Sequence, residues 1–186
     1  SDTTTVYLSS LDQLEGSFGG ELTLLKDCSY TGTALNFAPI DNVIDLNGYT
    51  LTSTMDLPLS SANSQLTIMG SGGSGGTVKG TLAKCGNGTL IIKEGVTMKG
   101  TRKISGYGNL IIEKGVSLEG DEYQILYNGG SIDLSAVDTI PKEGWQFKDQ
   151  GYGPTFGFDE DCNVKLPEGY AAYDEDNNVV TNVYND

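Results

Sequence analysis

The chain has 186 residues, which suits a single domain with a sizeable core, and its 25 acidic residues outnumber its 11 basic residues. The resulting net charge of −14 argues against strongly anionic partners such as nucleic acid and anionic membrane surfaces. The sequence contains no His, which excludes a Ser-His-Asp triad and a His-ligated zinc ion.

The N-terminal segment predicts a short helix. Ser10 begins a capping-box pattern, and a pair of Gly residues follows Phe18. Between them, Leu11, Leu14 and Phe18 recur at helical spacing. We expect this helix to cover the open end of a strand stack, because an uncovered end exposes apolar side chains and free strand edges.

A pattern of two apolar residues separated by one residue recurs through the next part of the chain. Its starts are separated by 22, 22, 24, 20 and 22 residues. A period near 20 residues in a strand-rich sequence is typical of a stacked solenoid. The copies are Leu22-Thr-Leu24, Ile44-Asp-Leu46, Leu66-Thr-Ile68, Leu90-Ile-Ile92, Leu110-Ile-Ile112 and Ile132-Asp-Leu134.

Two of these copies lie in blocks that align without a gap, Cys85–Gly100 and Ser105–Gly120. The longest interval contains Ser71–Gly76, a Ser/Gly run that we interpret as a flexible turn insertion. A second apolar segment follows most copies after a Gly that marks a bend. These second segments are Tyr49-Thr-Leu51, Thr77-Val-Lys79, Val96-Thr-Met98 and Val116-Ser-Leu118. Two or three short strands per repeat predict a parallel β-helix, whose coils stack about 4.8 Å apart.

The residues also carry a resemblance to a family. Ser10–Leu14, Leu22–Asp27, Asp45–Leu51 and the Asn-Gly-Thr-Leu-Ile-Ile block resemble right-handed, pectate-lyase-like β-helix modules of bacterial secreted and surface proteins. The resemblance covers roughly residues 6–135. It implies an all-β, right-handed, single-stranded parallel β-helix of about six coils with a period of about 22 residues. It does not specify an activity, because this fold carries lyases, hydrolases, adhesins and inert stalks.

We expect one domain over residues 1–186, with an N-terminal cap at 1–20, coils at 21–140 and a strand-rich cap at 141–186. In the C-terminal cap, strands are predicted at Val164–Leu166, Gly169–Tyr173 and Val179–Val183, the last two joined by a turn. Four aromatic residues are expected to cover the final coil, namely Trp145, Phe147, Phe156 and Phe158. No apolar run has the length of a membrane span, and the start at Ser1 is that expected of a mature or trimmed chain.

Three cysteines, Cys28, Cys85 and Cys162, stand at long and irregular spacing, which suits neither a disulfide framework nor a metal knuckle. We expect small buried side chains, with a single bridge as the alternative. Alternating oxygen ligands at Asp174, Asp176 and Asn178 could bind calcium, but Val179 stands where a calcium loop needs Gly, and a solvated hairpin turn is the favoured interpretation. No other cofactor is expected.

Catalysis would need paired carboxylates on neighbouring coils. The repeat places Asp45 and Asp133 at the same position of distant coils, so these two acids are too far apart to act together. The repeat also aligns Arg102 with Glu122, which suggests a surface salt bridge. The resemblance leaves a calcium-dependent polysaccharide lyase or a glycoside hydrolase-like fragment as the alternative function.

A cluster of Tyr residues in turns offers surfaces on which sugar rings could stack, although Tyr rings packing on one another explain it as well. These residues are Tyr107, Tyr123, Tyr127 and Tyr152. The favoured interpretation is a non-catalytic, extracellular or cell-surface module that binds a glycan or a host or matrix surface. A purely structural stalk is the second alternative.

Overall fold

The computed structural model describes residues 10–11, 14, 16–31, 35–53, 56–59, 61–80, 83–85, 87–99, 102–106, 108–119, 123–127, 130–137, 146–147, 155–158, 162–166 and 168. Over these residues the protein is built from short strands, and every strand pair is parallel. Most pairs join strands that lie about one repeat apart in the sequence, whereas β18 and β19 pair although they are successive strands.

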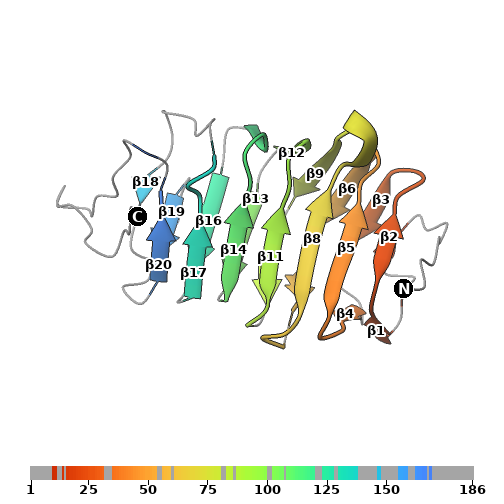
Figure 1. The fold of residues 1–186 in the computed structure, drawn as a ribbon, viewed down its shortest axis with the longest axis horizontal. Helices are drawn as coiled ribbons and strands as arrows, with labels where there is room; N and C mark the ends of the chain where they lie inside the picture. The colour runs from red at the N-terminus through yellow and green to blue at the C-terminus, as the bar shows by residue number, and fades with distance from the viewer. Residues whose placement is uncertain are drawn as a thin grey trace.

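A seven-stranded sheet runs along the molecule and forms its longest side (Figure 1). Its strands follow one another in chain order, with two strands on other sides between most of its members. They are β2 (Glu21–Thr23), β5 (Asp41–Asp45), β8 (Gln65–Met69), β11 (Thr89–Ile92), β14 (Asn109–Ile112), β17 (Gly130–Asp133) and β20 (Cys162–Lys165).

A five-stranded sheet forms the second side. It contains β3 (Cys28–Tyr30), β6 (Thr50–Ser53), β9 (Gly76–Gly80), β12 (Val96–Lys99) and β15 (Ser117–Glu119). The third side is made of three smaller sheets, and β4 lies next to β7 as β10 lies next to β13. Its strands are β1 (Gly16–Phe18), β4 (Leu35–Phe37), β7 (Asp56–Pro58), β10 (Ala83–Cys85), β13 (Arg102–Gly106), β16 (Tyr123–Tyr127), β18 (Gln146–Phe147) and β19 (Thr155–Phe158).

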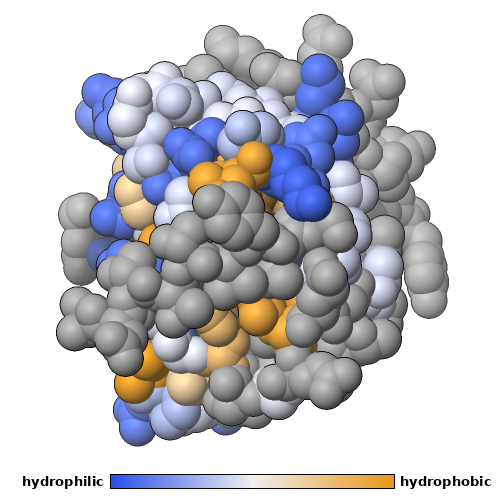
Figure 2. Space-filling model, turned by 90° about the vertical axis from the view of Figure 1, so that its right-hand side faces the viewer, coloured by the Kyte–Doolittle hydropathy of each residue, from blue (hydrophilic) through white to orange (hydrophobic). Residues whose placement is uncertain are grey.

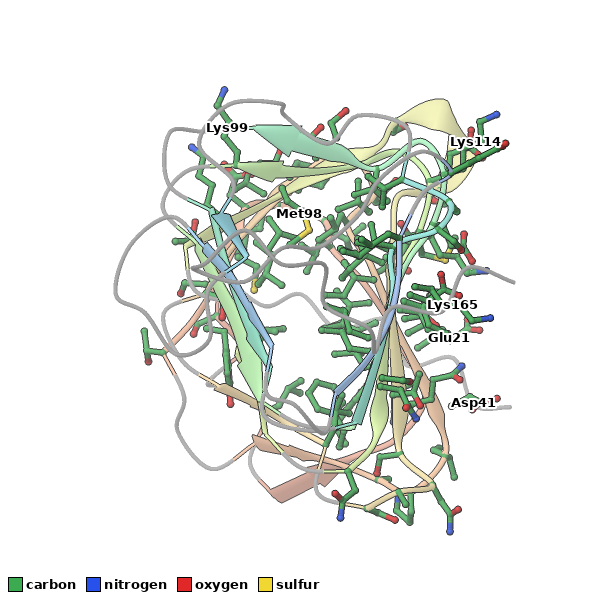
Figure 3. All side chains as sticks on the ribbon, turned by 90° about the vertical axis from the view of Figure 1, so that its left-hand side faces the viewer. Glu21, Asp41, Met98, Lys99, Lys114 and Lys165 are labelled. Atoms are coloured by element: carbon green, nitrogen blue, oxygen red, sulfur yellow. The ribbon has the colours of Figure 1, made fainter. Side chains whose placement is uncertain are left out.

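The chain passes from the first side to the second and then to the third before it returns, as Figure 3 shows along the long axis. This arrangement is compatible with the predicted parallel β-helix. The predicted strand at Val164 is confirmed, and β19 and β20 continue the third and first sides beyond residue 140. The strands predicted beyond Gly169 lie outside the described residues.

The core consists of columns of apolar side chains that stack from coil to coil. Strand residues alternate between buried and outward positions, as β11 and β14 show, because successive side chains of a strand point to opposite faces. One column contains Leu66, Leu90 and Leu110, and the next contains Ile44, Ile68, Ile92 and Ile112. All seven side chains are buried, and each contributes about 1.5–3 kcal/mol through removal from water.

The register between β5 and β8 differs from the one predicted. Ile44 pairs with Ile68 rather than with Leu66, and Leu66 pairs with Asn42. Asn42 therefore occupies a position of the leucine column, where its side chain is completely buried. Its amide satisfies four backbone groups at this corner, which explains how a polar residue takes that place.

The Ser/Gly insertion is held against the preceding coil. The Ser71 N–H donates to the Asp45 carboxylate (3.0 Å), and the Gly48 N–H donates to the Gly75 carbonyl (2.7 Å). A Cβ added to Gly76 would lie 2.3 Å from the Cβ of Leu46. Gly at that position allows the close packing, as expected of the Gly residues that precede the second segment of most repeats.

The predicted N-terminal helix is wrong for its last part. Phe18 lies in β1, which pairs with β4, and its ring packs edge-on against Phe37 at 6.3 Å between centroids. Leu11 is buried in a single turn that the Leu14 N–H closes onto the Leu11 carbonyl (3.0 Å), and Ser10 forms a bridge to Ser29. Residues 1–9, 12–13 and 15 of the predicted cap lie outside the described part of the chain.

The end of the stack nearest β2 has apolar residues among hydrophilic ones, as Figure 2 shows. Ile40, at this end, is 49% exposed. Such an end is where the sequence analysis placed a cap.

Candidate binding faces

The outward side of the seven-stranded sheet, which we call the long face, has a column of hydrogen-bonding side chains. Gln65, Thr89, Asn109 and Ser131 are in register on neighbouring strands. The Asn109 amide donates to the Thr89 hydroxyl (3.3 Å), and the Ser131 hydroxyl donates to the Asn109 side-chain oxygen (2.6 Å). Three coils thus present one connected row of amide and hydroxyl groups.

A largely aliphatic column runs beside the polar one. Val43, Thr67, Ile91 and Ile111 are in register. Thr67 is buried, whereas the other three are half-buried and share a boundary with solvent. The polar and aliphatic columns are two residues apart on each strand, about 7 Å, so together they form an amphiphilic strip.

A third column of the long face has charged groups. The Lys93 ammonium lies 3.9 Å from the Glu113 carboxylate, with side chains 45% and 41% exposed. An ion pair this exposed contributes at most about 1 kcal/mol. This pair borders the strip and gives it no net charge.

The outward side of the five-stranded sheet, which we call the short face, has two columns of its own. Thr50, Thr77, Thr97 and Ser117 form the first, in register and half-buried. Thr52, Lys79 and Lys99 are exposed and form the second. In Figure 3, Lys99 points away from the molecule and Met98 points into its interior.

The short face could have been read from the sequence. Thr77-Val-Lys-Gly80 and Thr97-Met-Lys-Gly100 are internal copies of one motif at a shift of 20 residues. Their alternation places Thr and Lys on the outward side once Val78 and Met98 are assigned to the core. Considered only as strands, these segments do not show what their outward positions share.

The predicted equivalence of Asp45 and Asp133 is wrong. Asp45 pairs with Met69, whereas Asp133 pairs with Ile111 and so belongs to a different column. The two-residue change of register at Asn42 causes this difference.

Both carboxylates have the same local role at the end of a strand. Asp45 accepts the Asn47 N–H (2.9 Å) as well as that of Ser71, and Asp133 accepts the Ser135 N–H (3.0 Å) and hydroxyl. Side chains of Asp commonly hold the backbone two residues on in this way. The bonds assign these acids to turns of the fold.

The calcium prediction at Asp174, Asp176 and Asn178 lies outside the described residues. Within the part of the chain that the structure describes, no three residues among Asp, Glu, Cys and His come together as a metal site would require. Cys28 is buried, as predicted, and its thiol donates toward the Ser29 carbonyl (3.7 Å).

Of the four predicted Tyr residues, Tyr107 and Tyr152 also lie outside the described residues. Tyr123 and Tyr127 belong to β16 and not to turns. By register, Tyr127 pairs with Phe158 and Tyr123 pairs with Arg102. Arg102 is therefore not the register partner of Glu122, because the offset between β13 and β16 is one residue longer than the internal repeat.

Comparison of the chain with family models, with curated proteins and with solved structures finds no match. Among the described residues, no helix has the length and apolar character needed to cross a membrane.

Proposed function

We propose that the protein is a non-catalytic, extracellular binding module of a bacterial surface protein, which holds a carbohydrate chain along its long face. The scaffold of this proposal is a right-handed parallel β-helix of about six coils with a period of about 22 residues. The order of the strands around three sides supports that fold.

One observation carries the proposal: a column of amide and hydroxyl groups lies in register beside a column of aliphatic side chains. Sugars present hydroxyl groups that both donate and accept, and the Gln, Thr, Asn and Ser side chains supply the matching groups. The ring C–H groups of a sugar suit a weakly apolar strip such as Ile91 and Ile111.

The dimensions of the strip favour a polymer over a small molecule. Neighbouring strands repeat about every 4.8 Å along the long axis, so an extended chain lying on that axis meets equivalent groups at regular intervals. A concave pocket would instead surround a small ligand. Tyr107, Tyr123, Tyr127 and Tyr152 remain proposed contacts for the carbohydrate.

The lyase or hydrolase alternative would require carboxylates placed for acid and base roles. No described contact favours it, because the oxygens of Asp45 and Asp133 bind backbone groups at turns. A structural stalk would need no ligand and is distinguished by experiment.

Binding is tested with a glycan array of plant, host and microbial glycans, followed by calorimetry on each positive glycan. The variant Asn109→Ala should weaken binding about tenfold, since it removes a hydrogen-bonding group at the centre of the polar column, an effect of about 1.4 kcal/mol. Thr50→Ala, on the short face, is the matched control and should bind like the parent chain. Its circular dichroism spectrum and that of Asn109→Ala should match the parent spectrum.

If no neutral glycan binds, only the interpretation as a structural stalk remains. If both variants weaken binding equally, the binding site does not lie on the long face. Release of unsaturated sugar products in the presence of calcium would instead support the lyase alternative.

A further inference from the structure

The basic residues of this acidic chain are concentrated in one stretch. Residues 79–103 contain six basic side chains and one acidic side chain, Glu94, for a net charge of +5. The total of −14 then leaves −19 for the rest of the chain. This concentration is unexpected for a protein whose overall field repels anions.

The fold brings most of these positions to one corner of two neighbouring coils. Strand β9 pairs with β12, and β10 lies next to β13. Lys79 and Lys99 stand near the ends of the first pair of strands, while the second pair contains Lys84, Arg102 and Lys103. The sixth basic residue, Lys93, lies elsewhere and pairs with Glu113.

At this corner the short face has a defined two-by-two arrangement. Lys79 is in register with Lys99, and Thr77 is in register with Thr97. Both Lys residues are exposed, and both Thr residues are half-buried. Two ammonium groups and two hydroxyls thus project from the same side of two adjacent strands, whose backbones are about 4.8 Å apart.

Like charges directly opposite each other on a sheet are unfavourable. An oxyanion between the two Lys side chains replaces this repulsion with two attractive interactions, and the hydroxyls can donate to its other oxygens. We propose that Thr77, Lys79, Thr97 and Lys99 form a binding site for a sulfate or carboxylate group of an acidic oligosaccharide. The site lies on the short face and does not depend on the neutral-glycan strip of the long face.

The size of the site favours an isolated anionic group over a long polyanion. In the Lys column, Thr52 precedes Lys79 and Glu119 follows Lys99. A nucleic acid strand crossing the coils would leave the basic corner and meet the acidic remainder of the surface. An oligosaccharide with spaced charges can place one group at the corner without that penalty.

The test measures binding by calorimetry at low ionic strength with three short oligosaccharides: sulfated, uronic and neutral. The parent chain should bind the sulfated or the uronic compound, and the difference between these two identifies the anion. Binding should weaken as salt is added, because dissolved ions screen the attraction between exposed charges. Any binding of the neutral compound should not depend on the salt concentration, because it involves no charge on the ligand.

The double variant K79Q/K99Q should weaken binding of the acidic compound at least tenfold, whereas K26Q/K165Q should not. Lys26 and Lys165 are also exposed, so the control removes the same charge from other places. Glu119→Gln should strengthen binding, because it removes the negative charge of the residue in register with Lys99. Thermal unfolding of each variant confirms that it is folded.

Three results would overturn the proposal: no binding of either acidic compound, equal losses in the two double variants, or tighter binding of a single-stranded oligonucleotide than of the acidic sugars. The outcome is separate from that for the long face, since Asn109→Ala is expected to leave binding of the acidic compound unchanged.

Discussion

Replacement of Asn42 by Leu gives the sharpest test of how the first coils are held together. The substitution makes the column uniform, because the register partners of Asn42 along the sheet are Leu66, Leu90 and Leu110. Hydrophobic burial alone would therefore predict a more stable protein, by about 1.5–3 kcal/mol for a buried Leu.

The hydrogen bonds of Asn42 predict the opposite sign. Its side-chain oxygen accepts the Gly20 N–H (3.2 Å), and its NH2 group donates to the carbonyls of Ala38, Ile40 and Gln65 at 3.0–3.1 Å. In the variant, the Ala38 and Ile40 carbonyls would each keep a hydrogen bond from a backbone N–H. The Gly20 N–H would lose its acceptor, the Asn42 side-chain oxygen.

The NH2 group shares its two N–H donors among three carbonyls, so the amide makes the equivalent of about three full hydrogen bonds, which at about 0.5–1.5 kcal/mol each sum to about 1.5–4.5 kcal/mol. The orphaned Gly20 N–H adds a further cost of at least about 1 kcal/mol. After the gain from burial is subtracted, Asn42→Leu should lower the free energy of unfolding by about 2 kcal/mol.

Urea denaturation followed by far-ultraviolet circular dichroism measures this difference. The exposed Asp41→Ala variant on the same sheet is the control and should change stability by less than about 0.5 kcal/mol. An Asn42→Leu protein as stable as the parent, or more stable, would refute the idea that this corner depends on the amide.

Two further changes test other contacts of the coils by the same assay. Gly76→Ala should destabilise the protein by about 3 kcal/mol, because its Cβ would overlap Leu46. Gly72→Ala should cost only about 1 kcal/mol, because the space there is open and only the φ of +64° is unfavourable. Similar losses of stability in both variants would contradict the packing role of Gly76. Asp45→Ala should lower the free energy of unfolding by about 2 kcal/mol, because the Asn47 and Ser71 N–H groups lose their shared acceptor. Replacement of the exposed Asp41 by Ala should be nearly neutral. An equally small effect at both positions would mean that Asp45 does not hold the insertion.

Periodicity predicted the parallel strands because each coil repeats the same apolar positions. Leu90 and Leu110 belong to blocks that align without a gap, and their register is confirmed in the structure. Asn42 marks where this reasoning fails, since a pattern that counts only apolar residues assigns a polar residue to the surface. The amide could hold that place because four backbone groups converge there, and such convergence is a tertiary property.

The N-terminal cap failed for a related reason. Leu11, Leu14 and Phe18 have helical spacing, but β4 offers Gly16–Phe18 a parallel partner, and pairing with it overrides local propensity.

The candidate binding faces were harder to predict from the sequence than the core. A column is assembled from residues about 20 positions apart, so its chemistry appears only after the exact register between coils is known.

The direction of the backbone hydrogen bonds has a mechanical consequence. The strands run across the long axis of the molecule, so the bonds between coils lie along that axis, with β2 and β20 at opposite ends of the longest sheet (Figure 1). Tension applied along the axis pulls on the hydrogen bonds between coils in series. The coils would therefore separate one after another, and the strands of a sheet would not resist the force together. A molecule of this shape would lengthen stepwise under a weak pull, with its end coils yielding before the leucine columns at its centre.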